Sequence, residues 1–292
     1  MKPLRFCHRA MACDFEVLLE HSDPHYAAKA AQAAFVELDR LELLLSRFLP
    51  NSDIARISTL KKGQSILVSP ETMECLQIAQ QVYRQTGGLF DVTVGGLVDL
   101  WKEQSPPRDA VQKMLRSVGM NKMKIHPETM SVEVNADGIM VDLGGIGKGY
   151  AVKQIAAVLN EWKVQQAIIH GGMSTLLALG PPAGAAGWKV QLTNPVSQQI
   201  IRVLQMKREA LSCSGLRRGT DMIHPVTGLA IQDKSAVWVK GGDPAVCDAL
   251  STASMVMNLQ QIERLTQEYP SIGIFVVLKD KPNQPPIQYG CW

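Results

Sequence analysis

Two long stretches of the chain repeat their apolar residues every three to four positions, which predicts amphipathic helices. They cover residues 24–45 and 70–86. Both begin with proline, which suits the first turn of a helix, and Gly87 and Gly88 follow the second stretch. Ser52 is a suitable N-cap for a short helix that ends at residue 57. Further helices are predicted over 109–117, 150–162, 244–257 and 259–269.

Shorter runs of β-branched and apolar residues predict strands between these helices. The strands do not alternate strictly with the helices, so the pattern favours an α+β fold over a doubly wound parallel sheet. We expect mixed β-sheets with flanking helices. Because no linker is visible, we expect a single domain over residues 1–292 with two closely packed lobes. The predicted strands are 15–20, 122–125, 131–134, 138–141, 166–170, 188–193, 200–206, 236–239 and 272–278.

The composition is that of an ordinary globular protein, with 46% hydrophobic and 20% charged residues. A net charge of +3 without a basic run argues against a nucleic-acid partner. No apolar run reaches the ~18–20 residues of a membrane span, and the six cysteines lack the C-x-x-C spacing of zinc sites. The first nine residues lack the apolar core of a signal peptide. We therefore expect a cytoplasmic protein, unless an export signal has been removed.

The run from Asp142 to Val152, Asp-Leu-Gly-Gly-Ile-Gly-Lys-Gly-Tyr-Ala-Val, is the most informative segment. A predicted strand leads into glycines and Lys148, and a predicted helix starts at Tyr150. Glycines let backbone N–H groups approach a ligand closely, and a helix N-terminus attracts anions. The spacing matches neither a Walker A motif nor a dinucleotide fingerprint. A phosphate site and a purely structural turn are both compatible with this segment.

Asp248 and Thr252 lie four residues apart in a predicted helix, so they share one helix face. A carboxylate and a hydroxyl that face one point suit Mg²⁺, which prefers oxygen ligands. The structural alternative is that Thr252 hydrogen-bonds back to its own helix. On spacing alone the structural alternative is favoured.

Eight segments of the chain resemble, in order, the landmarks of one known family. Residues 142–150 resemble its D-L-G-G-I-A-K-G-Y run, and residues 247–253 resemble its A-D-A-L-S-T-A run. The family is ApbE, the FAD:protein FMN transferases. The other segments are 11–17, 45–58, 88–101, 170–173, 212–215 and 224–228, which resemble M-G-T-x-F, S-x-[YF]-x-x-x-S-x-[IL], G-x-F-D-x-T-V-G…L-W, G-G-[NS], T-S-G and D-P-x-T-G.

The resemblance implies an ApbE-like fold and a Mg²⁺-dependent enzyme. Such an enzyme cleaves FAD, attaches FMN by a phosphoester bond to a Thr or Ser of a target flavoprotein, and releases AMP. The resemblance places Mg²⁺ on Asp248, Thr252 and a main-chain carbonyl at Gly145. Asp248 and His224 are candidates for the base that activates the acceptor hydroxyl. The residues that the resemblance implies for FAD binding are Met11, Phe48, Asp142, Lys148, Gly171, Gly172, Ser214 and Asp221.

The main departure from the family is Asp221-Met-Ile-His224-Pro225, where the family commonly reads H-[IL]-[IL]-D-P. The histidine and the aspartate have exchanged places, and the family's first histidine lies by the flavin. This exchange motivates one alternative, an FAD-binding protein without turnover. The other alternative keeps the chemistry but replaces the protein hydroxyl by water, which makes an FAD pyrophosphatase that releases FMN and AMP.

Overall fold

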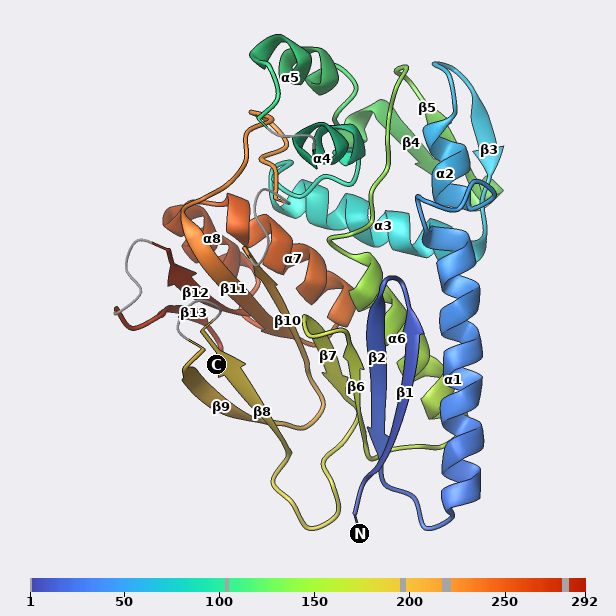
Figure 1. The fold of residues 1–292 in the computed structure, drawn as a ribbon, viewed down its shortest axis with the longest axis vertical. Coiled ribbons are helices and arrows are strands. Elements are labelled where there is room, and N and C mark those ends of the chain that lie inside the picture. The colour runs from blue at the N-terminus through green and yellow to red at the C-terminus, as the bar shows by residue number, and fades with distance from the viewer. Residues whose placement is uncertain (1, 103–104, 195–197, 217–221, 280–283) are drawn as a thin grey trace.

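An eight-stranded antiparallel sheet forms the centre of the protein (Figure 1). The computed structural model describes residues 2–102, 105–194, 198–216, 222–279 and 284–292. The strands follow the order β1-β2-β6-β7-β10-β11-β12-β13 across the sheet. Their bounds are β1 Leu4–Ala10, β2 Cys13–Leu19, β6 Ala167–Gly171, β7 Thr175–Ala178, β10 Ala210–Gly215, β11 Lys234–Gly241, β12 Gly273–Leu278 and β13 Ile287–Gly290.

A three-stranded sheet, a two-stranded ribbon and the helices complete the architecture. The small sheet has the order β3-β5-β4, and the ribbon pairs β8 with β9. Within the described ranges, no helix combines the length and the apolar character needed to cross a membrane. The smaller strands are β3 Ser65–Leu67, β4 Met123–His126, β5 Ser131–Val134, β8 Trp188–Thr193 and β9 Ile200–Met206. The helices are α1 Pro24–Leu45, α2 Asp53–Ser58, α3 Pro70–Gln85, α4 Gly95–Lys102, α5 Arg108–Leu115, α6 Gly147–Glu161, α7 Pro244–Val256 and α8 Leu259–Glu268, with the short 3₁₀ helices η1 Met120–Lys122 and η2 Pro127–Thr129.

Helices and the ribbon cover opposite faces of the large sheet. Strand β11 shows this best, because alternate side chains of a strand point to opposite faces. Val237 and Val239 join the core that the strands share with α1, α6 and α7. Ala236 and Trp238 join a second core, which Trp188 of the β8–β9 ribbon helps to cover. The sheet is therefore buried on both sides where it borders the helices and the ribbon.

The predicted α+β fold is confirmed, and the sheets are antiparallel rather than mixed. Each named strand pairs with its neighbours in antiparallel register. Among the described residues, parallel pairing is confined to an isolated bridge between Val94 and Met140. This bridge replaces the strand predicted over 138–141, a prediction that was wrong. The segment instead lies beside residues 92–94, and the N–H of Asp142 donates to the carbonyl of Val92 at 2.7 Å.

The predicted helices agree closely with the structure, whereas α4 was not predicted. Helix α1 has the predicted bounds, and α3 ends one residue before the predicted end. Ser52 caps α2 by accepting a hydrogen bond from the N–H of Ala55 at 3.0 Å. Helix α6 begins at Gly147, three residues before the predicted start, so Lys148 lies in its first turn.

The turn between β1 and β2 adopts an unfavourable backbone conformation. Ala10 pairs with Cys13, and the two residues between them, Met11 and Ala12, have φ values of 49° and 59°. A two-residue hairpin of this kind favours glycine or asparagine, because both positions are left-handed. A left-handed residue with a side chain costs about 1–2 kcal/mol. The packing of Met11 against the main core helps to hold the turn.

Helices α6 and α7 cross at Gly149 with no room for a side chain. A β-carbon at this position would overlap the carbonyl oxygen of Pro244 and would lie 2.7 Å from the β-carbon of Asp248. Only glycine allows two backbones to approach this closely. The first turn of α6 is therefore held directly against α7.

We expect Gly149→Ala to lower the free energy of unfolding by about 1–3 kcal/mol, the usual cost of overpacking a tight contact. Gly147→Ala is the matched control, because a β-carbon there would meet its nearest neighbour, the β-carbon of Leu143, at 3.7 Å. Alanine is the better helix former, so the control should be as stable as the wild type or more stable. Urea unfolding followed by circular dichroism measures both variants. Equal stability of the two variants would contradict the tight crossing.

Candidate functional site

Asp248 is a buried carboxylate at the contact between α6 and α7, with 2% of its surface exposed. The N–H of Gly149, in the first turn of α6, donates to Oδ2 at 2.9 Å, and the hydroxyl of Thr175 donates to Oδ1 at 3.0 Å. Burial raises the pKa of Asp248, whereas the charge of Lys148 and these two hydrogen bonds oppose that rise. The positive end of α6 and Lys148 thus favour the ionised carboxylate.

Further hydroxyl oxygen atoms lie close together about one helical turn along α7 from Asp248. The hydroxyl oxygen of Ser214 lies 3.1 Å from that of Thr252 and 2.8 Å from that of Ser251. Gly145 lies against the same threonine, since a β-carbon there would be 3.0 Å from Thr252 Oγ1. The glycine-rich turn, strand β10 and helix α7 therefore meet at one place. The structure brings together the three residues that the sequence predicted as metal ligands.

The chemistry of this donor set fits a hard cation. The described part of the chain has no cluster of three or more His, Cys, Asp and Glu residues. A metal that needs several charged side chains would therefore find no site among these residues. Mg²⁺ is commonly bound by one or two carboxylates together with substrate phosphates. The single carboxylate of Asp248, the hydroxyl of Thr252 and the neighbouring backbone of Gly145 match that requirement.

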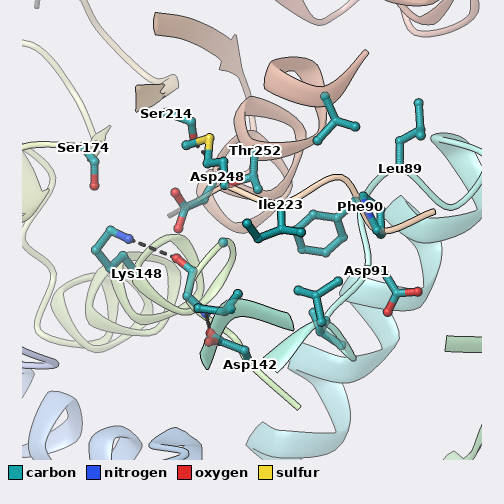
Figure 2. Close-up of a pocket in the computed structure, with 18 of the residues that line it drawn as sticks. Leu89, Phe90, Asp91, Asp142, Lys148, Ser174, Ser214, Ile223, Asp248 and Thr252 are labelled. Atoms are coloured by element: carbon teal, nitrogen blue, oxygen red, sulfur yellow. Dashed lines mark hydrogen bonds between the residues drawn. The ribbon is translucent and has the colours of Figure 1, made fainter. Parts of the chain in front are cut away.

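A first cavity of about 390 Å³ opens beside these groups (Figure 2). Lys148 and Asp248 lie at one end of it, and Phe90 and Leu89 lie at the other. Lys148 Nζ donates to the carbonyl of Gly144 at 3.3 Å, so its side chain lies along the glycine-rich turn. The polar residues of the lining are Asp91, Asp142, Lys148, Ser174, Ser214, Asp248 and Thr252, and the apolar ones include Leu89, Phe90, Val92, Val94, Val98, Met222, Ile223 and Val256.

A second cavity of about 200 Å³ adjoins the other side of the turn. Met11 and Phe48, both predicted to contact the cofactor, line it together with Asp142 and Lys148. Phe48 is 74% exposed, so much of its side chain is open to solvent. The guanidinium carbon of Arg47 lies 5.0 Å from the centre of that ring. The binding role of these residues stays a prediction, but the structure places all four on one cavity.

Asp142 is held in a fixed position by two partners. Its Oδ1 accepts the N–H of Gly144 at 2.7 Å, and its Oδ2 accepts Nη1 of Arg47 at 3.0 Å. Arg47 also forms an ion pair with Asp99 and donates to the carbonyl of Gly95. Arg47 therefore ties the glycine-rich turn to α4. Sequence reasoning missed this residue, although a cation directly before Phe48 was a usable signal.

Other predicted residues fall outside the cavities or outside the described ranges. His224 does not line the first cavity, although Ile223 and Pro225 do. Its Nδ1 accepts the N–H of Val226 at 3.2 Å, and burial lowers its pKa. Asp221 lies outside the described residues. Of the exchanged pair, Asp221 and His224, His224 therefore does not line the first cavity.

Gly171, the last residue of β6, and Gly172, which follows it, have different surroundings. A β-carbon at Gly171 would lie 2.8 Å from Cγ2 of Val152, so this glycine permits close packing against α6. Gly172 has a φ of 63° and belongs to the turn that precedes Thr175.

Thr175 was missed by sequence reasoning, because nothing in its local pattern indicates a contact with Asp248.

Proteins of known sequence resemble this chain over most of its length. A protein of Buchnera aphidicola subsp. Schizaphis graminum, named FAD:protein FMN transferase, is 22% identical over 248 residues, which cover 78% of this chain and 73% of that protein. A protein of Treponema pallidum with the same name is 25% identical over 284 residues, covering 86% of this chain and 78% of that protein.

Solved structures share the fold. The flavin transferase ApbE from Vibrio cholerae superposes with a TM-score of 0.87 at 20% identity, covering 99% of this chain and 96% of that one. The ApbE protein of Thermotoga maritima gives a TM-score of 0.88 at 22% identity, covering 99% and 97%. A family model described as the ApbE family matches residues 11–276. This chain therefore belongs to the ApbE family.

Proposed function

We propose that this protein is a Mg²⁺-dependent FAD:protein FMN transferase that acts as a single domain over residues 1–292. The observation that carries the proposal is the buried carboxylate of Asp248, which shares a cavity with Lys148 and Thr252 beside the first turn of α6. A cation favours the ionised form of a buried carboxylate, and an anionic substrate is attracted to a lysine and a helix N-terminus. The names of the relatives support the same activity.

FAD lies across the first and second cavities in this proposal, with its pyrophosphate at the turn that both cavities share. Lys148 binds phosphate oxygens, and the positive end of α6 adds to the attraction. The exposed face of Phe48, with Met11 beside it, packs on a ring of the cofactor. Asp142, fixed by Arg47, orients the nucleotide from the turn. The remaining FAD contacts in this proposal are Gly171, Gly172, Ser214 and Asp221.

Asp248, Thr252 and the carbonyl of Gly145 hold Mg²⁺ in the proposal. The chemistry that a bound Mg²⁺ supplies is to offset the negative charge that develops on the pyrophosphate. The protein contributes the fixed carboxylate, because Gly149 and Thr175 hold both of its oxygens in place.

The proposed reaction is one displacement at the phosphorus of the FMN half. The acceptor Thr or Ser oxygen forms a bond to this phosphorus, and the bond to the bridging oxygen breaks. The electron pair of the broken bond stays with AMP, which leaves. The hydroxyl proton goes to a base. Of the two candidates, Asp248 is favoured over His224, because Asp248 lines the cavity and His224 does not.

Incubation of FAD with the protein and Mg²⁺ separates the three candidate activities. Chromatography detects FMN and AMP, and flavin fluorescence in a denaturing gel detects FMN attached to an acceptor protein. Attached flavin with AMP release supports the transferase. Free FMN with AMP indicates the pyrophosphatase, and unchanged but bound FAD indicates a binding protein.

We expect Asp248→Asn to lower Mg²⁺-dependent cleavage of FAD by roughly 100-fold or more, on the scale of losing a group that stabilises transition-state charge. The amide keeps the shape of the side chain but loses the charge. Calorimetric titration with Mg²⁺ in the presence of FAD should show weakened binding, and circular dichroism should show an intact fold.

Ser254→Ala on the same helix is the matched control for this variant. Ser254 is buried, and its hydroxyl has no hydrogen-bond partner among the described residues. Its removal should leave activity unchanged and stability equal or higher. Wild-type cleavage by Asp248→Asn would show that the carboxylate has only a structural role.

The exchanged pair can be tested by restoring the family's order with Asp221→His and His224→Asp. We expect the wild type to cleave FAD already, because metal and phosphate contacts supply most of the catalysis in phosphoryl transfer. The double variant should alter FMN attachment to an acceptor more than FMN release. Parallel assays of both activities check this. Equal changes in FMN attachment and FMN release would refute the expectation that the pair affects attachment more. An inert wild type together with an active double variant would favour the FAD-binding protein without turnover.

A further inference from the structure

Lys148 lines a third cavity in addition to the two described above. This third cavity, of about 420 Å³, is lined by strand β8 and by the turn between β6 and β7. Figure 2 shows Ser174, which belongs to that turn, at the Lys148 end of the first cavity, away from Leu89 and Phe90. The residues that the first and third cavities share are Lys148, Ser174, Cys213 and Gly215. Lys148 therefore stands where three cavities meet.

A transfer from one molecule to another at a single phosphorus needs room for three groups around that phosphorus. The flavin half stays bonded, the adenylate half leaves, and the acceptor oxygen enters opposite the leaving group. The first and second cavities share Asp142, Gly144 and Lys148, which belong to the proposed phosphate-binding turn. These two cavities therefore suit the two halves of FAD. The third cavity is the space that remains for the acceptor.

The lining of the third cavity mixes polar and apolar groups and carries little charge. Among its described residues there is no carboxylate, and Lys148 at the junction supplies the positive charge. Gln191 and Thr193 of β8 both line the cavity. Amide and hydroxyl side chains can both donate and accept hydrogen bonds, as the backbone of an extended peptide requires. The lining therefore suits a neutral peptide better than a group with several negative charges, such as a pyrophosphate.

The mouth of the cavity offers an apolar contact as well. Met173, in the turn between β6 and β7, is 85% exposed and lines the cavity. A flexible thioether side chain adapts to different partner surfaces. A volume of about 420 Å³ falls within the range of pockets that bury a ligand of drug size.

We infer that the third cavity receives the acceptor, an extended segment of the partner protein whose Thr or Ser hydroxyl reaches the phosphorus beside Lys148. This inference rests on the proposed transferase function. Gln191 and Thr193 bind the backbone of the segment, and Ser174 lies where the segment enters the first cavity. The bonds that form and break are those of the displacement given above, so the cavity supplies position and not a separate chemical step.

The test uses Gln191→Trp, which fills the cavity from an exposed position on β8. Lys189→Trp is the matched control, because Lys189 is exposed on the same face of the same strand but does not line the cavity. The acceptor probe is a mixture of N-acetylated heptapeptides with threonine fixed at the centre. Mass spectrometry measures FMN attachment to the peptides, chromatography measures FAD hydrolysis without peptide, and calorimetry measures FAD affinity.

We expect Gln191→Trp to reduce peptide labelling by about tenfold or more, which corresponds to about 1.4 kcal/mol of lost interaction. FAD affinity and FAD hydrolysis should be unchanged, and Lys189→Trp should match the wild type in all three assays. Labelling by Gln191→Trp at the wild-type rate would overturn the inference. A parallel loss of FAD affinity would also overturn it, because the cavity would then hold part of FAD. A wild type that hydrolyses FAD but labels no peptide would refute the transferase itself.

Discussion

The close crossing of α6 and α7 at Gly149 is the constraint on which the candidate site depends. Because no side chain separates the two backbones, the N–H of Gly149 reaches the carboxylate of Asp248 at 2.9 Å. A buried carboxylate is costly without such partners. The same crossing holds Lys148, one residue earlier, beside the carboxylate. A larger residue at position 149 would disturb the helix packing and the site together.

The large antiparallel sheet supplies the other side of the site. Strands β7 and β10 are neighbours in that sheet, so Thr175 and Ser212 pair directly, and their hydroxyl oxygens lie 3.2 Å apart. Ser214, two residues along β10, points to the same face and reaches Thr252. The hydroxyl groups beside α7 therefore come from strands whose register fixes their spacing. Of these groups, Ser214 and Thr252 line the first cavity.

The parts of the structure that could be predicted from sequence are those with local signals. Helix α1 and the cap at Ser52 follow from periodicity and from a single side chain. The partners of Asp142 and Asp248 could not be predicted in this way. Arg47 lies 95 residues from Asp142, and Thr175 lies 73 residues from Asp248. Their meeting depends on the assembled sheet and helices.

Short elements were also hidden from sequence reasoning. Strand β7 has four residues, too few to show a clear alternation. The segment over 138–141 has the composition of a strand but forms only an isolated bridge between Met140 and Val94. The family motifs grouped Gly145, Asp248 and Thr252, and all three line the first cavity, whereas their role as metal ligands stays a prediction. Motifs in a fixed order carry information about contacts that periodicity lacks.

The position of Lys148 at the meeting point of three cavities has a kinetic consequence. Donor and acceptor that enter through separate cavities can occupy the protein at the same time, so neither has to depart before the other arrives. In the proposed arrangement no flavinyl intermediate on the protein's own side chains is needed, so sequential and not ping-pong kinetics are expected. A single displacement of this kind inverts the configuration at phosphorus.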